Sequence, residues 1–222
     1  MVDIGQNLPM RLDHISYVAS HEHVVDVVQR IGSLLSSTFL DGGIHPRFGT
    51  RNFVMPLLNK TYLEVVCPLE HPATDETPFG KAVKKRAEMG GGWLSWVLST
   101  NEIDKLESRF DRKAVEGHRR KPDGIELLWK QIGVLGTLED SQLPFFVEWQ
   151  TNLHPSSDGH ASASIDKIEI IGSSEKVTTW VGFPLQEFLG NVGVTFKSAS
   201  SQELNGILSV EFRTRNGIIK ID

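Results

Sequence analysis

The sequence predicts an α+β fold made of three repeated units, each with the element order strand, helix, strand, strand, strand. In each unit a strand-like run is followed by a stretch whose apolar residues recur at helical spacing, and then by three more strand-like runs. The units at residues 12–67, 92–150 and 165–221 are 56, 59 and 57 residues long. We therefore expect one domain at residues 1–154, which pairs the first two units, and a third, structural unit at residues 155–222.

The first unit shows this pattern most clearly. Its predicted strand, helix, glycine-interrupted segment and two further strands are residues 12–18, 23–35, 41–49, 52–58 and 61–66. Asn59 and Lys60 separate the last two strands, which predicts a hairpin with a tight turn.

The second and third units repeat the same order. The elements of the second unit are predicted at 93–98, 103–110, 117–120, 125–132 and 144–149. Those of the third unit are predicted at 165–171, 174–183, 192–197, 207–213 and 217–221. Between the units, apolar residues at helical spacing predict a connecting helix at 78–89, and the Ser- and Gly-rich segment 151–164 is typical of a loop.

The composition is that of an ordinary globular protein. Hydrophobic residues make up 39% of the 222 residues and charged residues 23%, so the chain has enough apolar surface for a core. A formal net charge of -5 argues against nucleic acid as a partner, because phosphate binding needs a basic surface. No apolar run approaches the roughly 18 residues of a membrane helix, and no signal peptide is visible. We expect a cytoplasmic protein without nucleic-acid or membrane partners.

Several short motifs follow one another in a distinctive order. They are Asp13-His14-Ile15, the run GGIHPRFGTRN at 42–52, Tyr62-Leu63-Glu64, Pro122-Asp123-Gly124, the run LPFFVEW at 143–149, and His154-Pro155. Together they resemble the glyoxalase-like domain proteins of the vicinal oxygen chelate superfamily, which also includes bleomycin resistance proteins and dioxygenases. The resemblance extends over most of the chain and implies that paired βαβββ units form a cupped mixed sheet. Because this fold hosts several chemistries, the resemblance does not select a reaction.

The resemblance also implies a metal site. In the superfamily, residues on the first and fourth strands of each unit hold a divalent metal, and these positions correspond to His14 and Glu64 in the first unit and to Glu148 in the second. Trp93 falls opposite His14, so one family position has no ligand. Three ligands with open coordination sites suit a catalytic Mn, Fe, Ni or Zn ion. Such an ion would stabilise an enolate-like intermediate, as in a lyase or isomerase.

Basic and polar residues near the predicted cup are candidates for substrate binding. His45, Arg47, Arg51 and Asn52 lie on the glycine-flanked segment of the first unit. An arginine fork beside a histidine suits a carboxylate or enolate and the transfer of a proton next to it. Arg119, at the matching place in the second unit, adds positive potential. We therefore expect the ligand to be small, oxygenated and anionic.

Proton transfer has three further candidates. His45 and His154 are the predicted proton carriers, and Glu148 is a predicted catalytic carboxylate as well as a ligand. Each assignment has a simpler alternative: His14 is then a histidine satisfied within the sheet, Glu64 faces solvent, and the other groups lie in solvated turns and loops.

Two other functions are consistent with the sequence. The missing ligand at Trp93 favours a metal-free protein that binds or sequesters a small molecule without catalysis. In the third unit, Lys167 aligns with the first-strand ligand position and Lys220 with the fourth-strand position, and two cations cannot hold a metal ion. That unit is expected either to complete a sheet or to supply a subunit interface, as in a homodimer.

Overall fold

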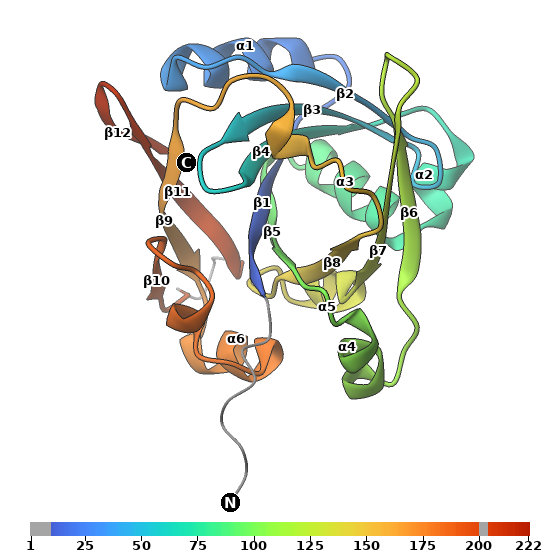
Figure 1. Ribbon diagram of the computed structural model, residues 1–222, viewed down its shortest axis with the longest axis vertical. Coiled ribbons are helices and arrows are strands. Elements are labelled where there is room, and N and C mark those ends of the chain that lie inside the picture. The colour runs from blue at the N-terminus through green and yellow to red at the C-terminus, as the bar shows by residue number, and fades with distance from the viewer. Residues whose placement is uncertain (1–9, 200–203) are drawn as a thin grey trace, which may run out of the picture.

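The computed structural model describes residues 10–199 and 204–222. Within them the chain forms a curled eight-stranded sheet and a separate four-stranded sheet (Figure 1). In chain order the elements are β1 (Arg11–Val18), α1 (Val24–Leu35), β2 (Leu40–His45), β3 (Thr50–Leu57), β4 (Thr61–Pro68), α2 (Pro72–Glu76), α3 (Pro78–Glu88), β5 (Gly92–Ser99), α4 (Ile103–Phe110), β6 (Val115–Arg120), β7 (Glu126–Ile132), α5 (Val134–Glu139), β8 (Phe145–Trp149), η1 (Pro155–Ser157), β9 (Ser164–Ile171), α6 (Ser174–Val181), η2 (Leu185–Glu187), β10 (Gly193–Lys197), β11 (Gly206–Thr214) and β12 (Gly217–Ile221). The predicted α+β fold class is confirmed. None of the described helices has the length and apolar character that a membrane crossing needs.

The first two units share the curled sheet. Its strand order is β1-β4-β3-β2-β6-β7-β8-β5, and β5 pairs antiparallel with β1 to close the curl on one side. On the other side, β2 and β6 meet at one residue pair, Ile44 and Arg120. In each unit the first strand is parallel to the fourth, β1 to β4 and β5 to β8. The two units therefore have the predicted βαβββ order, with an additional helix, α5, before β8.

The turn between β3 and β4 sets the register of two site residues. Asn59 and Lys60 have φ angles of 63° and 57°, the left-handed conformation that a type I′ hairpin turn requires. The predicted tight turn is therefore confirmed. In the resulting register, Asn52 and Glu64 lie on the same face of the sheet, close enough to hydrogen-bond.

The third unit has the predicted element order but a different strand order. Its sheet runs β10-β9-β11-β12, with β10 parallel and β11 antiparallel to β9. The alignment with the first unit implied that Lys167 on β9 and Lys220 on β12 lie on neighbouring strands, but β11 separates the two strands. Lys167 forms an ion pair with Glu211 at 3.0 Å, and Lys220 forms one with Glu169 at 3.3 Å.

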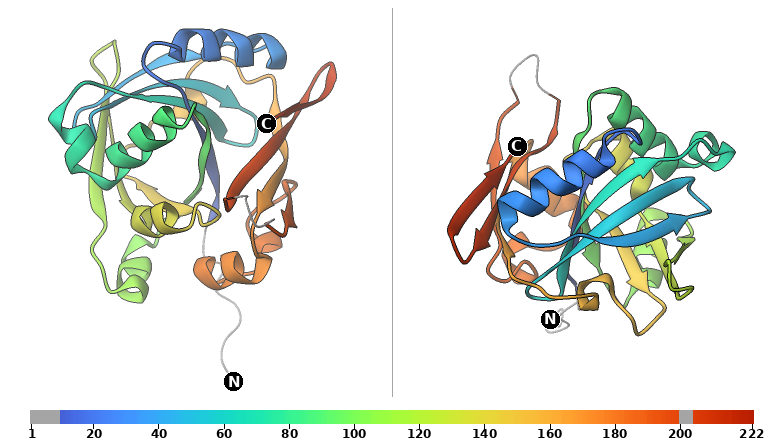
Figure 2. Two further views of the ribbon diagram at one scale, coloured as in Figure 1. Left: turned by 180° about the vertical axis from the view of Figure 1, so that it is seen from behind. Right: turned by 90° about the horizontal axis from the view of Figure 1, so that it is seen from above.

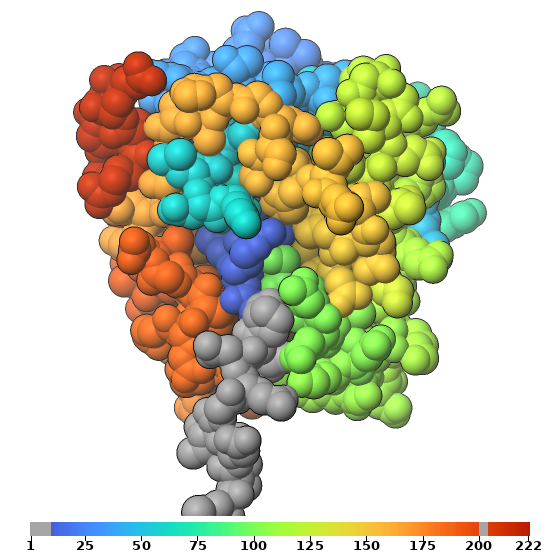
Figure 3. All heavy atoms as spheres, viewed as in Figure 1, coloured from blue at the N-terminus to red at the C-terminus, as the bar shows by residue number. Residues whose placement is uncertain are grey.

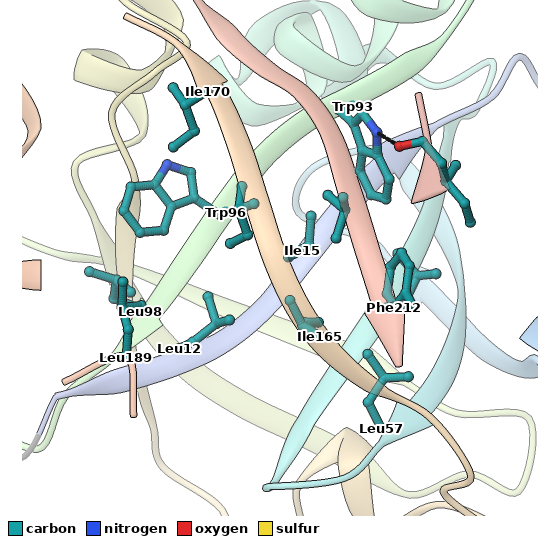
Figure 4. Packing of buried hydrophobic residues seen from close by; sticks show 14 of the residues in the cluster. Leu12, Ile15, Leu57, Trp93, Trp96, Leu98, Ile165, Ile170, Leu189 and Phe212 are labelled. Carbon is teal, nitrogen blue, oxygen red and sulfur yellow. Dashed lines mark hydrogen bonds between the residues drawn. The ribbon is translucent and has the colours of Figure 1, made fainter. Parts of the chain in front are cut away.

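The main hydrophobic core lies between the two sheets. Trp93 and Trp96 of β5 and Ile15 of β1 belong to one apolar cluster with Ile170 and Phe212 of the second sheet, and Trp96 lies near Ile170 (Figure 4). Trp93 also donates a hydrogen bond from Nε1 to the carbonyl of Ile221, at 3.1 Å. In the space-filling view the third unit, in orange and red, lies directly against the first two units (Figure 3). It covers an apolar face that would otherwise meet water.

Helices α2 and α3 come from the segment between the first two units, and α3 lies across one end of the curled sheet (Figure 2). Phe79 and Val83 of α3 belong to a second, smaller apolar cluster with Phe48, Val97 and Phe145. This cluster encloses the interior of the curled sheet from one side. The interior is therefore a confined space, and the site described next lies in it.

Candidate functional site

Polar side chains gather inside the curled sheet. Five of them line a small cavity of about 30 Å³: His14, His45, Asn52, Glu64 and Arg119. Each is at most 6% exposed. The rest of the lining is mostly aromatic or aliphatic and consists of Phe48, Tyr62, Phe79, Trp129, Gln131, Phe145, Val147 and Trp149. Because buried polar groups normally have hydrogen-bond partners, the partners of these five residues define the chemistry of the site.

Glu64 of β4 is a buried carboxylate with two hydrogen-bond donors. Oε2 accepts from Ser16 Oγ at 2.6 Å, and Oε1 accepts from Asn52 Nδ2 at 2.7 Å. Burial alone would raise the pKa of Glu64, but the nearby rings of His14 and His45 and the two hydrogen bonds bring it below its usual value. The site therefore holds an ionised carboxylate at neutral pH.

Asp13 and His14 form a second hydrogen-bonded pair. Asp13 is fully buried, and its Oδ1 lies 2.8 Å from Nδ1 of His14. Burial alone would raise the pKa of Asp13, but hydrogen bonds from His14 and His154 hold it well below its usual range. An ionised carboxylate only accepts, so Nδ1 of His14 carries the proton. Nε2 then faces the cavity, 4.0 Å from Oε2 of Glu64, while the ring stacks on Tyr62 with centroids 4.3 Å apart.

His45 is neutral at physiological pH. Its Nδ1 lies 2.9 Å from Thr50 Oγ1, and its ring meets Trp129 edge to face. The pKa of His45 is lowered to about 4, mainly by burial, with the opposing charge of Glu64 outweighed by burial and the positive charge of Arg119. His45 can therefore accept or donate a hydrogen bond in the cavity, but it carries no charge there at pH 7.

Arg119 of β6 is a buried cation whose guanidinium is incompletely paired. The residue is 2% exposed, and no carboxylate of residues 10–199 and 204–222 lies within 4.0 Å of it. Its Nε and Nη2 have no hydrogen-bond partner within the same part of the chain, and neither does Oδ1 of Asn52. Burial lowers the pKa of Arg119, although nearby Tyr62 and Glu64 oppose this effect. Unpaired donors on a buried cation are typical of a site for an anion.

A glycine makes room for this cation. A Cβ atom at Gly42 would lie 2.1 Å from Asn52 Oδ1 and 3.0 Å from Arg119 Nη1. The first approach is far too short for a Cβ atom and the second is tight, so a side chain at position 42 would displace Asn52 and crowd Arg119.

The predicted ligand Glu148 lies outside this group. On β8, Phe145, Val147 and Trp149 face the cavity, and the alternation of the strand turns Glu148 to the other side. There its Oε1 accepts a weak hydrogen bond from the backbone N–H of Ile103 at the start of α4, at 3.4 Å. The structure therefore corrects the predicted placement of Glu148 in the cup.

The strand positions show which residues of the two units correspond. β1 begins at Arg11 and β5 at Gly92, while β4 ends at Pro68 and β8 at Trp149, so both pairs of strands are offset by 81 residues. At this offset Ser95 corresponds to His14 and Phe145 to Glu64. The second unit therefore has no His, Cys, Asp or Glu at either position. Trp93 is not the counterpart of His14, because its side chain lies in the core between the two sheets.

The donor set for a metal ion is incomplete as a result. His14 and Glu64 lie together, but Glu148 does not join them. Among the residues that the structure describes, no three His, Cys, Asp or Glu side chains form a group that could hold a metal ion. The predicted set does not fit a metal in this arrangement, and the chemistry below is derived from the protein's own groups.

Three other predicted residues lie outside the cavity. The side chain of Arg51 points to the face of β3 opposite to that of its inward-facing neighbours, and it forms an ion pair with Asp41. Arg47 is exposed and lines an adjacent hollow. Nε2 of His154 lies 3.1 Å from Oδ2 of Asp13, so His154 supports the carboxylate behind the cavity without lining the cavity itself.

The site residues predicted from the sequence did not include Asp13, Ser16 or Gln131. The sequence could have indicated Asp13, because a charged residue beside His14 in an apolar strand needs a partner if it is buried. Ser16 lies two residues after His14 and therefore on the same face of the strand. Gln131, whose Oε1 accepts from Trp129 Nε1 at 2.9 Å, had no comparable signal.

The fold and the cavity define a class of protein: paired βαβββ units whose curled sheet encloses a polar small-molecule site. The family model described as the glyoxalase-like domain matches residues 12–182. The chain belongs to this glyoxalase-like domain family, which confirms the resemblance seen in its sequence. No curated protein matches the chain.

Solved structures share the fold at low sequence identity. A hypothetical protein from Staphylococcus aureus is similar with a TM-score of 0.65 and 16% identity, over 96% of this chain and 99% of that chain. Methylmalonyl-CoA epimerase from Mycobacterium tuberculosis has a TM-score of 0.43 and 13% identity, over 67% of this chain and 92% of that chain. At 16% identity, the similarity to the Staphylococcus aureus protein shows the fold alone.

Proposed function

We propose that this protein binds a small, oxygenated anion inside the curled sheet and moves a proton on it. The observation that carries the proposal is the buried guanidinium of Arg119, with two of its nitrogen atoms unpartnered among the described residues. A buried charge without a partner costs several kcal/mol. An anionic ligand would supply that partner through a pair of charge-assisted hydrogen bonds.

The groups around Arg119 support proton transfer on such an anion. A ligand with a hydrogen on the carbon next to its carbonyl would present that hydrogen to Glu64 or to Nε2 of His14. The base takes the proton, and the electrons of the C–H bond form an enolate whose oxygen carries the negative charge. Arg119 would stabilise that oxygen, and Asp13 would stabilise the charge on the His14 ring. This is the proton chemistry of an isomerase or lyase.

Two alternative functions were also predicted from the sequence. In the first, the protein binds or sequesters the same anion without catalysis; the anion site on Arg119 supports this function equally well. In the second, a divalent ion assists the reaction; the closeness of His14 and Glu64 favours it, and Ser95 and Phe145 at the corresponding positions of the second unit argue against it.

Replacing Arg119 tests the anion site. Pyruvate serves as the probe, and its binding is followed by the fluorescence of Trp129 and Trp149, which line the cavity. We expect saturable binding to the wild type and at least 10-fold weaker binding to Arg119→Met, because the bidentate ion pair is lost. Arg120→Met is the matched control, since Arg120 is the next residue on β6 and is exposed.

Three outcomes separate the possibilities. Equal affinity of the wild type and Arg119→Met, or the absence of saturable binding to the wild type, would contradict the proposal. Binding that disappears in EDTA and returns with Mn, Fe, Ni or Zn would support the metal-assisted alternative. Binding unaffected by EDTA, lost in Arg119→Met and kept in Arg120→Met is the result we expect.

A further inference from the structure

A second hollow, which we name the outer pocket, adjoins the cavity. It has a volume of about 280 Å³ and lies between the start of α3 and the turn from β7 to α5. Phe48, Phe79 and Gln131 line both the cavity and the outer pocket. These three side chains therefore form the wall between the two spaces.

The sizes of the two spaces differ greatly. The cavity, at about 30 Å³, has room for about one or two water molecules. The outer pocket approaches the roughly 300 Å³ at which small-molecule sites begin. Only the head of a larger ligand therefore fits beside Arg119, and the remainder of that ligand needs the outer pocket.

The outer pocket has apolar walls and a basic rim. The apolar residues that line it are Phe48, Pro78, Phe79, Val115, Ile132, Val134 and Leu135. Arg47 and Arg112 on the rim are exposed and have no ion pair within the described part of the chain, whereas Lys113 is paired with Glu107 at 2.8 Å. Glu76 is the one acidic residue of the lining. The rim therefore has an excess of positive charge that attracts an acidic group.

We propose that the outer pocket binds the arm of the ligand whose oxygenated head lies on Arg119. This inference rests on the proposed function and names the substrate class: an oxyanion head, an apolar arm of several carbons, and an acidic group at the far end. The apolar walls match the arm, and Arg47 and Arg112 match the terminal acid. Arg47 is thus a substrate-binding residue at the rim of the outer pocket and not inside the cup.

A ligand that spans both spaces needs only the side chain of Phe79 to move. The Phe79 ring lies 5.6 Å from that of Phe48 and 6.2 Å from that of Phe145, measured between centroids. A Cβ atom at the next residue, Gly80, would lie 2.6 Å from the carbonyl oxygen of Phe48 and 2.7 Å from that of Thr74. The backbone of α3 is held close to its neighbours at this point, so a ligand that spans both spaces displaces the phenyl ring and leaves the helix in place.

Three 2-oxo acids test the inference. Pyruvate is the head alone, 2-oxooctanoate adds an apolar arm, and 2-oxosuberate has the same chain length with a second carboxylate at its end. We expect affinity for the wild type to rise in this order. In the variant Arg47→Met/Arg112→Met, 2-oxosuberate should lose roughly 3- to 10-fold in affinity, the range for two exposed charge pairs, with little change for the other two acids. Arg120→Met/Arg215→Met is the control with the same change in net charge on exposed residues elsewhere.

The possible results separate the two proposals. If pyruvate binds and depends on Arg119, but the longer acids bind no more tightly, the outer pocket is not part of the site and the proposed function stands. The same conclusion follows if the rim variant and the control weaken 2-oxosuberate equally. If none of the three acids binds the wild type, both proposals fail.

Discussion

Ionisable side chains inside the curled sheet show burial and hydrogen bonding acting in opposite directions. For the carboxyl groups of Asp13 and Glu64, burial alone would raise the pKa, and hydrogen bonds and nearby histidines reverse the effect. For His45, burial lowers the pKa to about 4, and its single side-chain bond, to Thr50, does not restore it. The cavity therefore combines ionised carboxylates with a neutral His45, which is the arrangement that proton abstraction at neutral pH requires.

The lowered pKa of His45 makes stability depend on pH. In the unfolded chain the pKa is about 6.5, so between pH 7 and pH 4 the unfolded state binds a proton that the folded state does not. The contribution of His45 to the free energy of unfolding is fully present above pH 6.5, the pKa of this residue in the unfolded chain. It is lost as the pH falls from there to about 4, the pKa in the folded protein. Between pH 7 and pH 5 the wild type should lose about 2 kcal/mol from this residue, and His45→Gln should not. Urea unfolding at the two pH values measures the difference.

The exposed His160 supplies the control for this prediction. His160→Gln should keep the pH dependence of the wild type, because this side chain is exposed and lies outside the cavity. Equal loss of stability in the wild type and His45→Gln would show that His45 is not the group responsible.

At the scale of elements, the register of β8 decides which carboxylates enter the site. Glu64 and Glu148 occupy similar motifs at the ends of their units, yet one faces the cavity and the other faces α4. A shift of one residue moves every side chain of a strand to the opposite face. β8 presents Val147 to the cavity as a result, and the face of this strand toward the cavity is apolar.

The two glutamates form a matched pair for a test of proton transfer. In D₂O, the exchange of the pyruvate methyl hydrogens for deuterium measures the abstraction of a proton from the carbon next to a carbonyl. We expect Glu64→Gln to slow the exchange by about 10²-fold or more, since a positioned base contributes that much. Glu148→Gln should leave the rate unchanged and cost at most about 1 kcal/mol of stability, through the start of α4. A larger effect of Glu148→Gln on exchange than of Glu64→Gln would contradict the assignment.

At the scale of the whole molecule, the third unit packs against the first two through a shared hydrophobic core. Its sheet places Phe212 against Trp93, with the two rings stacked at 6.4 Å, and both residues are buried. The apolar face of this unit is thus occupied within the chain. That face cannot serve as the interface of a homodimer without exposing the outer side of β1 and β5, so any dimer would use another surface.

Replacing Phe212 tests this coupling. Phe212→Ala should lower the free energy of unfolding by about 3–5 kcal/mol, because a large buried side chain is removed from a packed core. Tryptophan fluorescence and far-UV circular dichroism should still report one shared transition. Ile218→Ala, on the exposed side of β12, is the control and should cost much less. Separate transitions for the two sheets would show that the third unit folds independently.

Much of the fold was predictable because it depends on local periodicity. The three units, the connecting helix and the turn at Asn59 and Lys60 follow from residue spacing and turn chemistry, which act over a few residues. His14, Glu64, His45, Asn52 and Arg119 were all named from the sequence, and the structure brings all five to one cavity. The family resemblance selected His14 and Glu64, and the resemblance together with residue type selected the other three.

The sequence by itself determined the repeat, the family and the residue types available for chemistry. The tertiary structure alone decided which of these residues meet. Alternation along a strand shows which residues share a face but not which face is inside, so Glu148 was placed in the cup and lies outside it. Asp13 and the outer pocket depend on contacts between segments far apart in the chain, with Trp149 and His154 reaching Asp13 across more than 130 residues. Such contacts arise from the packing of the units, which no local pattern in the sequence encodes.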